Sequence, residues 1–149
     1  MTAPRKPQTA GMLNIGHGRR DEGLALLREA ADAVAGSPWD VGPLGSNLVR
    51  AGVDRRDRDL ADLGVKLLEA AVTAEPQAPT LRRDLALAYG TLGRPADAEP
   101  HLKAAAELAA TNADTAAIYA TFLRSLNRPA EAERWSQEAA RRTAARAKP

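Results

Sequence analysis

The side chains that could perform acid–base or metal chemistry are few and poorly spaced in this chain. It has two histidines, His17 and His101, and no cysteine, so disulfides, thiolate metal sites and a cysteine nucleophile are excluded. Neither histidine belongs to an H-E-x-x-H or related metal-binding spacing. A serine-nucleophile elbow, a Walker loop and a dinucleotide-binding glycine motif are all missing from the sequence. We therefore predict no metal, no cofactor and no enzymatic activity.

The charged residues give two further patterns. The 19 acidic and 21 basic residues alternate at helical spacing, which is typical of weak surface pairs worth about 0.2–0.5 kcal/mol each. The stretch GHGRRDEG at 16–23 places two arginines before an expected helix. A bound anion at that helix N-terminus is one interpretation. A turn in which Asp21 caps the helix is the favoured one.

The composition indicates one helical domain. Of 149 residues, 44% are apolar but only 3% are aromatic, so the interior must consist of Leu, Val and above all Ala, the strongest helix former. No stretch alternates apolar and polar residues as a strand would. The N-terminus lacks the apolar core of a secretion signal, and no 18-residue apolar run could span a membrane. We expect a cytoplasmic protein.

The elements that would position any binding residues are identified by a repeat. LGRPADAE at 92–99 recurs as LNRPAEAE at 126–133, with Leu126 lying 34 positions after Leu92. Before the first copy, Leu81, Leu85 and Ala88 recur on one helical face. Gly93 suits a left-handed helix end, and Pro95 suits the opening of the next helix. The pattern predicts helix, tight turn, helix, and then the same again.

This pattern resembles the tetratricopeptide repeat (TPR) family, whose signature has a similar period. The matching positions of one unit are Leu85, Ala86, Tyr89, Gly93, Ala98, Leu102 and Ala105. Those of the next unit are Tyr119, Ala120, Leu123, Asn127, Ala132, Ser136 and Ala139. The resemblance implies an all-α superhelix of about four helix–turn–helix units that binds proteins or peptides.

We expect a flexible N-terminal segment at 1–8, a TPR-like domain at 9–144 and a basic tail at 145–149. The four units are expected near 4–37, 38–78, 79–112 and 113–144. Pro4 and Pro7 should delay the opening helix until about Thr9. The second unit carries seven extra residues, VDRRDRD at 53–59, which would lengthen both of its helices by about one turn. Such a charge run is typical of a solvated protrusion, with a partner-docking role as the alternative.

A partner is expected on the concave face, which the resemblance assigns to the first helix of each unit. The candidate residues there are Trp39, Ser46, Arg50, Thr80, Arg83, Leu87, Thr91, Thr121 and Arg124. Three arginines among small uncharged residues suit a partner rich in carboxylates. The alternatives are that these arginines only solubilise the surface, and that Trp39 packs as a wedge between units.

The C-terminal helix predicts a second contact. Trp135 is expected on an outer face left partly uncovered, which would favour homo-oligomers or a second protein. The alternative is that Arg141, Arg142 and Arg146 cover this face with their alkyl stems.

The predicted function is a non-catalytic adaptor, scaffold or assembly factor. The competing functions are an accessory subunit of an enzyme complex and a nucleic-acid-associated protein that uses its arginine-rich ends. The near-neutral net charge of +2 and the few aromatics argue against nucleic acid.

Overall fold

The computed structural model describes residues 7–148, and this part of the chain consists of eight helices without a strand. The helices form four antiparallel pairs, because the densest contacts join α1 to α2, α3 to α4, α5 to α6 and α7 to α8. The predicted all-α chain of helix–turn–helix units is confirmed. Contacts group the pairs into two compact units, Met1–Glu75 and Pro76–Pro149, called unit 1 and unit 2 below.

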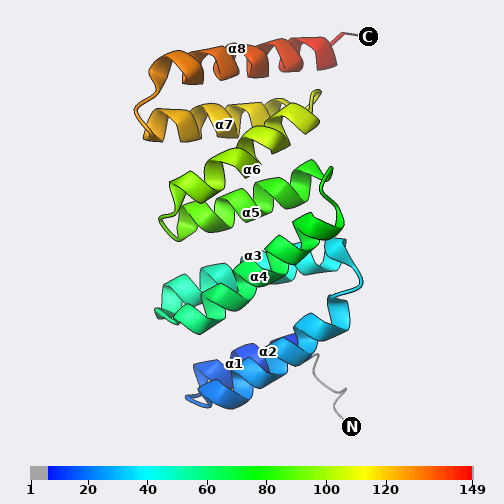
Figure 1. Cartoon of the computed structure of the whole chain (residues 1–149), viewed down its shortest axis with the longest axis vertical. Helices are drawn as coiled ribbons and strands as arrows, with labels where there is room; N and C mark the ends of the chain where they lie inside the picture. The colour runs from blue at the N-terminus through cyan, green and yellow to red at the C-terminus, as the bar shows by residue number, and fades with distance from the viewer. Residues whose placement is uncertain (1–6, 149) are drawn as a thin grey trace. The chain divides into compact units, whose positions relative to one another are not determined.

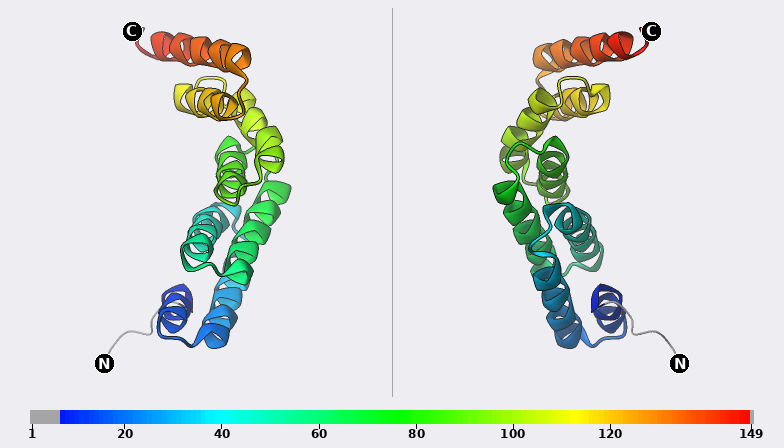
Figure 2. Two further views of the ribbon diagram at one scale, coloured as in Figure 1. Left: turned by 90° about the vertical axis from the view of Figure 1, so that its left-hand side faces the viewer. Right: turned by 90° about the vertical axis from the view of Figure 1, so that its right-hand side faces the viewer.

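Unit 1 contains α1 (Pro7–Gly16), α2 (Arg20–Val34), α3 (Pro38–Arg55) and α4 (Arg58–Ala74). Helix α1 begins at Pro7, two residues before the expected start, because proline is tolerated in the first helical turn. Residues 1–6 of the expected flexible segment lie outside the described residues. Within the unit, α1 and α3 lie on one side of α2 and α4 (Figure 2). Its core is a cluster of Leu and Ala side chains that includes Leu27, Leu48 and Leu60.

Unit 2 contains α5 (Pro79–Thr91), α6 (Pro95–Leu108), α7 (Ala113–Ser125) and α8 (Pro129–Arg146). Helix α6 follows α5 and precedes α7 along the unit (Figure 1), and α5 and α7 lie on the same side of α6 (Figure 2). Buried aromatic residues, which the core of unit 1 lacks, join the Leu and Ala side chains here: Tyr89 and Tyr119 are 6% and 2% exposed. Helix α8 continues to Arg146 and so extends two residues into the expected basic tail.

The four pairs turn in the same way. Each turn contains one residue with a left-handed backbone: Gly18, Arg56, Gly93 and Asn127. In each turn a backbone N–H bonds the carbonyl five residues earlier, as Arg94 does to Tyr89 at 2.9 Å and Arg128 does to Leu123 at 3.0 Å. This bond satisfies a carbonyl that the ending helix would leave open. Pro95 and Pro129 then occupy the first position of α6 and α8, as the repeated RP dipeptide predicts.

One capping expectation from the sequence needs correction. Asp21 does not cap α2, because Arg19 occupies the N-cap position and no side chain bonds the open backbone N–H groups there. The charged segment 53–59 lengthens both helices of its pair as expected, and all of its residues except Asp57 are exposed. Helix α3 continues to Arg55 and α4 begins at Arg58, so the extra residues lengthen the helices and leave only a two-residue turn. In that turn Asp57 is buried and accepts a hydrogen bond from the Leu60 N–H at 3.1 Å.

Candidate functional site

The candidate binding residues lie on the first helices of three pairs. In unit 2, α5 carries four of them and α7 carries two, on helices that share one side of the unit (Figure 2). These six are Thr80, Arg83, Leu87, Thr91, Thr121 and Arg124. In unit 1, all three lie on α3: Trp39, Ser46 and Arg50. The structure therefore places the six residues of unit 2 on two helices that share one side of the unit, and the three of unit 1 on a single helix.

On the unit 2 surface, Leu87 is 47% exposed, an unusual state for a large apolar side chain in this chain. The hydroxyls of Thr91 and Thr121 each donate a hydrogen bond to the backbone carbonyl one helical turn earlier, so each hydroxyl hydrogen already has an acceptor within its own helix. Such a surface offers an apolar contact with few polar groups that would lose a partner on binding. We call the exposed side of α5 and α7 around these residues the α5–α7 surface.

The two arginines of the α5–α7 surface are only weakly engaged. Arg124 donates to the neutral hydroxyl of Ser136 on α8 and forms no ion pair with a described residue. Arg83 reaches one oxygen of Asp84 at 3.4 Å, a long contact. Burial raises the pKa of Asp84, and the neighbouring Arg83 acts in the opposite direction. Both guanidiniums therefore remain open to a carboxylate from outside, which an arginine can grip with two hydrogen bonds.

The unit 1 candidates differ among themselves. Trp39, in the first turn of α3, is 58% exposed. Ser46 is half-buried, and Arg50 is exposed and donates to the amide oxygen of Asn47 at 2.8 Å. The exposure of Trp39 disagrees with the alternative that it packs as a wedge.

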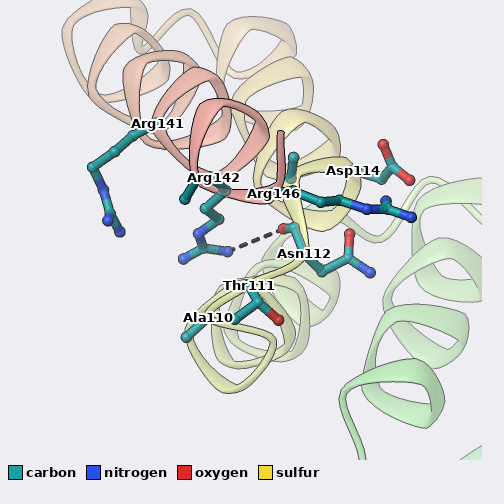
Figure 3. A pocket seen from close by; sticks show the side chains of 9 residues that line it. Ala110, Thr111, Asn112, Asp114, Arg141, Arg142 and Arg146 are labelled. Carbon is teal, nitrogen blue, oxygen red and sulfur yellow. Dashed lines mark hydrogen bonds between the residues drawn. The ribbon is translucent and has the colours of Figure 1, made fainter. Parts of the chain in front are cut away.

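A polar pocket of about 520 Å³ lies in unit 2 where the turn between α6 and α7 meets the end of α8 (Figure 3). Three arginines line it, but two are already bound within the fold. Arg142 is 6% exposed and donates to the carbonyls of Ala106, Ala109 and Asn112 at 2.9, 3.0 and 3.2 Å. It also donates to Glu138 at 2.7 Å.

Hydrogen bonds from Arg141 and then from Arg142 lower the pKa of Glu138 to about 2. Only Arg146 has no ion pair with a described residue, and its side chain extends to the Asp114 side of the pocket (Figure 3). The pocket thus connects α8 to the preceding turn, and its cations are largely neutralised.

Sequence reasoning missed the buried role of Arg142, although a signal for it existed. Trp135, Ala139 and Arg142 are spaced by four and three residues, so they share one face of α8. That face packs inward. The Trp135 ring meets the Tyr119 ring edge-on at 5.1 Å, and the Arg142 guanidinium lies 5.7 Å from the Trp135 ring centre. Trp135 therefore lies on the packed face of α8, where it is half-buried, and the Arg142 guanidinium lies near its ring.

Within unit 1, an ion-pair cluster joins the two helix pairs. Arg20, at the start of α2, donates to both oxygens of Asp57 at 2.7 and 2.8 Å and to Asp59 at 2.6 Å. The hydrogen bond from Arg20 holds the pKa of Asp57 below its ordinary value, and burial works against this shift. Unit 2 has a similar contact, in which Arg128 pairs with Glu99 on α6 and with Glu131. These ion pairs join neighbouring helix pairs within each unit.

Among residues 7–148, no group of three or more His, Cys, Asp or Glu side chains could hold a metal ion. None of the described helices is long and apolar enough to cross a membrane.

The paired helices, their common turn and the 34-residue spacing define a fold of the tetratricopeptide type. No protein-family model and no curated relative matches the sequence. The chain is similar to solved structures of MamA. One MamA crystal structure has a TM-score of 0.67 at 15% identity and covers 96% of this chain and 80% of MamA. A structure of MamA AMB-1 has a TM-score of 0.63 at 22% identity and covers 93% of this chain and 78% of its own. A structure of MamA MSR-1 has a TM-score of 0.60 at 23% identity and covers 95% of this chain and 77% of its own. At this level of identity the similarity concerns the fold.

Proposed function

We propose that this chain is a non-catalytic protein-interaction module whose α5–α7 surface binds an acidic segment of a partner protein. The observation that carries the proposal is the combination of Leu87, almost half exposed, with two weakly engaged arginines: Arg124 bonds only a neutral hydroxyl, and Arg83 has only the long 3.4 Å contact with Asp84. Leu87 supplies apolar area to bury, and Arg83 and Arg124 select a partner with carboxylates. An adaptor, scaffold or assembly factor would use such a surface, and so would an accessory subunit of an enzyme complex.

The charge distribution at the C-terminus favours a protein partner over nucleic acid. Arg141 and Arg142 share Glu138, and Arg142 is turned inward onto three carbonyls. The basic residues near the C-terminus therefore present fewer free cations than the sequence suggests. Nucleic-acid affinity depends on the number of cations that can neutralise phosphates.

Charge reversal on the α5–α7 surface tests this proposal. The full chain selects binders from a phage-displayed library of random peptides, and their affinities are measured by titration calorimetry. We expect peptides with Asp or Glu near an apolar residue, and we expect R83E/R124E to weaken them at least tenfold. The control is K103E/R134E, which changes the net charge equally on the second helices α6 and α8.

Equal binding by both double variants, or selection of peptides without acidic residues, would contradict the α5–α7 surface as an acidic-peptide site. Far-UV circular dichroism of each variant verifies that the fold is retained. A single-stranded oligonucleotide bound with steep salt dependence would instead support the nucleic-acid alternative.

A further inference from the structure

The start of α3 in unit 1 combines an exposed aromatic ring with a mainly apolar pocket. Trp39 is 58% exposed, more than the other exposed large apolar side chains in the part of the chain that the structure describes. Pro43 lies one helical turn further along the same face of α3 and lines a pocket of about 370 Å³. Ala30, Ala33 and Val34 of α2 and Leu44 of α3 line the same pocket, and Pro7 of α1 lies at its edge. We call Trp39, Asp40, Pro43 and this pocket the α3 groove.

The polar side chains that line the pocket of the α3 groove are Asp40 and the neutral amides of Gln8 and Asn47. Asp40 is exposed and forms no ion pair with any residue that the structure describes. This carboxylate follows Trp39 directly in the sequence. Groups of this kind suit a ligand that brings N–H donors and positive charge.

The size and the lining of the pocket in the α3 groove indicate which apolar group of a ligand would fit. A cavity of about 370 Å³ lies within the size range of small-ligand pockets, roughly 300–1,000 Å³. Its apolar lining favours an aliphatic or aromatic side chain. Trp39 beside it offers a flat surface on which a guanidinium or ammonium group gains a cation–π contact. Tryptophan is also among the residues that contribute most to binding when a partner covers them.

We infer that the α3 groove docks a partner segment in which an apolar side chain fills the pocket while a neighbouring Arg or Lys pairs with Asp40 beside Trp39. Charge complementarity selects this occupant, because Asp40 is the one charged side chain among the residues that line the pocket. The preference is opposite to that of the α5–α7 surface, so the site goes beyond the proposed function. Its failure would leave the α5–α7 proposal intact.

Peptide selection with matched variants of α3 tests the inference. The full chain and the variant D40K are used to select from the phage-displayed random library described above. We expect the wild-type chain to enrich a second group of peptides in which Arg or Lys lies within two residues of Leu, Ile, Phe or Met. We expect W39A and D40K each to weaken a synthetic peptide of this group at least tenfold. The controls on the same helix are V53A, which removes another partly exposed apolar side chain, and D54K, which reverses another unpaired carboxylate.

A charge exchange sharpens the result. Replacing the basic residue of the peptide by Glu should abolish binding to the wild-type chain and restore part of it to D40K. In W135F, Trp39 is the one remaining tryptophan of the two in the sequence, and its emission should shift to shorter wavelength when the basic peptide binds.

Three outcomes would overturn the inference. The first is that no peptide with a basic residue is enriched. The second is that W39A and D40K bind the peptide as tightly as V53A and D54K do. The third is that analytical ultracentrifugation shows a concentration-dependent mass increase which W39A abolishes, because the occupant would then be a second copy of this chain.

Discussion

Unit 1 and unit 2 form the same helix–helix contact with different residues. In unit 1, Gly45 of α3 faces Gly64 of α4, and a β-carbon added to Gly64 would lie 2.6 Å from the Gly45 carbonyl oxygen. Gly11 and Gly23 face each other in the same way in the first pair. The matching positions of unit 2 in the 34-residue alignment are alanines, all at most 2% exposed: Ala86, Ala98, Ala120 and Ala132. The backbones of unit 1 therefore approach more closely than alanine permits.

The two units also fill their interiors differently. The core cluster of unit 1 contains only aliphatic side chains, such as Leu27, Leu48 and Leu60. Unit 2 adds Tyr119, Phe122 and Trp135 in contact along α7 and α8. Large rings need more space between helices, which the alanines of unit 2 leave and the glycines of unit 1 do not. The same repeat pattern thus allows two kinds of packing. The residue at the helix–helix contact, Gly or Ala, must change together with the size of the core side chains.

The ion pairs between helix pairs differ in burial. In unit 1 the side chain of Asp57 is 7% exposed and also caps α4. In unit 2 both partners of the Arg128–Glu99 pair are about one-third exposed. Because water screens exposed pairs, the contact in unit 1 should contribute more to stability than the one in unit 2. The comparison therefore predicts that substitutions at corresponding contacts lower the free energy of unfolding by different amounts in the two units.

The largest expected effect is that of G64A. The added methyl would meet the Gly45 carbonyl and the backbone of Val49 at 2.7 Å, and backbone atoms cannot move aside as a flexible side chain can. We expect a loss of about 3 kcal/mol in the free energy of unfolding, the upper end for overpacking. Hydrogen exchange should show faster opening of α3 and α4 than of α7 and α8.

The matched control for G64A is G90A on α5, where an added methyl has nothing within 4 Å. It should raise stability by about 0.5–1 kcal/mol, because alanine favours helix over glycine. If G64A were as harmless as G90A, the close approach of α3 and α4 would not be required for the fold.

A smaller effect is expected for the Asp57 contact, and it depends on pH. The pKa of Asp57 is lowered in the folded state, so its stabilisation is present above the unfolded pKa of about 3.9 and is lost as the pH falls through the lower folded value. D57N should cost about 2 kcal/mol at pH 7, in the range of hydrogen bonds to charged groups. Urea unfolding of both proteins at pH 7, 5 and 3 measures this difference.

We expect the difference between the wild-type chain and D57N to be the same at pH 7 and 5 and to shrink at pH 3. In unit 2, E99Q should cost less at pH 7 because its carboxylate is 28% exposed, against 7% for Asp57. An unchanged difference at pH 3, or a larger cost for E99Q, would contradict the ranking of the two contacts.

The sequence predicts the helices and turns of this fold more reliably than the contacts between helix pairs. The repeated RP dipeptide and Gly93 specify local backbone geometry, and α6 and α8 do begin at Pro95 and Pro129. The contact of Arg20 with Asp57 joins residues 37 positions apart and arises only when two pairs stack. For that reason the buried pairing of Asp57 does not follow from the sequence alone. The candidate residues on α5 and α7 follow from helical spacing, whereas the α3 groove needs three helices in place before its pocket exists.

The smallest expected effect is that of A98G, which introduces the residue type of unit 1 into unit 2. Ala98 is fully buried in α6, and glycine there gains backbone entropy on unfolding. We expect a loss of about 1 kcal/mol from helix propensity, without the clash that makes G64A costly. Thermal unfolding by circular dichroism, with hydrogen exchange to localise the change to α5 and α6, measures it. A gain in stability from A98G would mean that the helices of unit 2 can close to the spacing of unit 1, and that the aromatic core does not hold them apart.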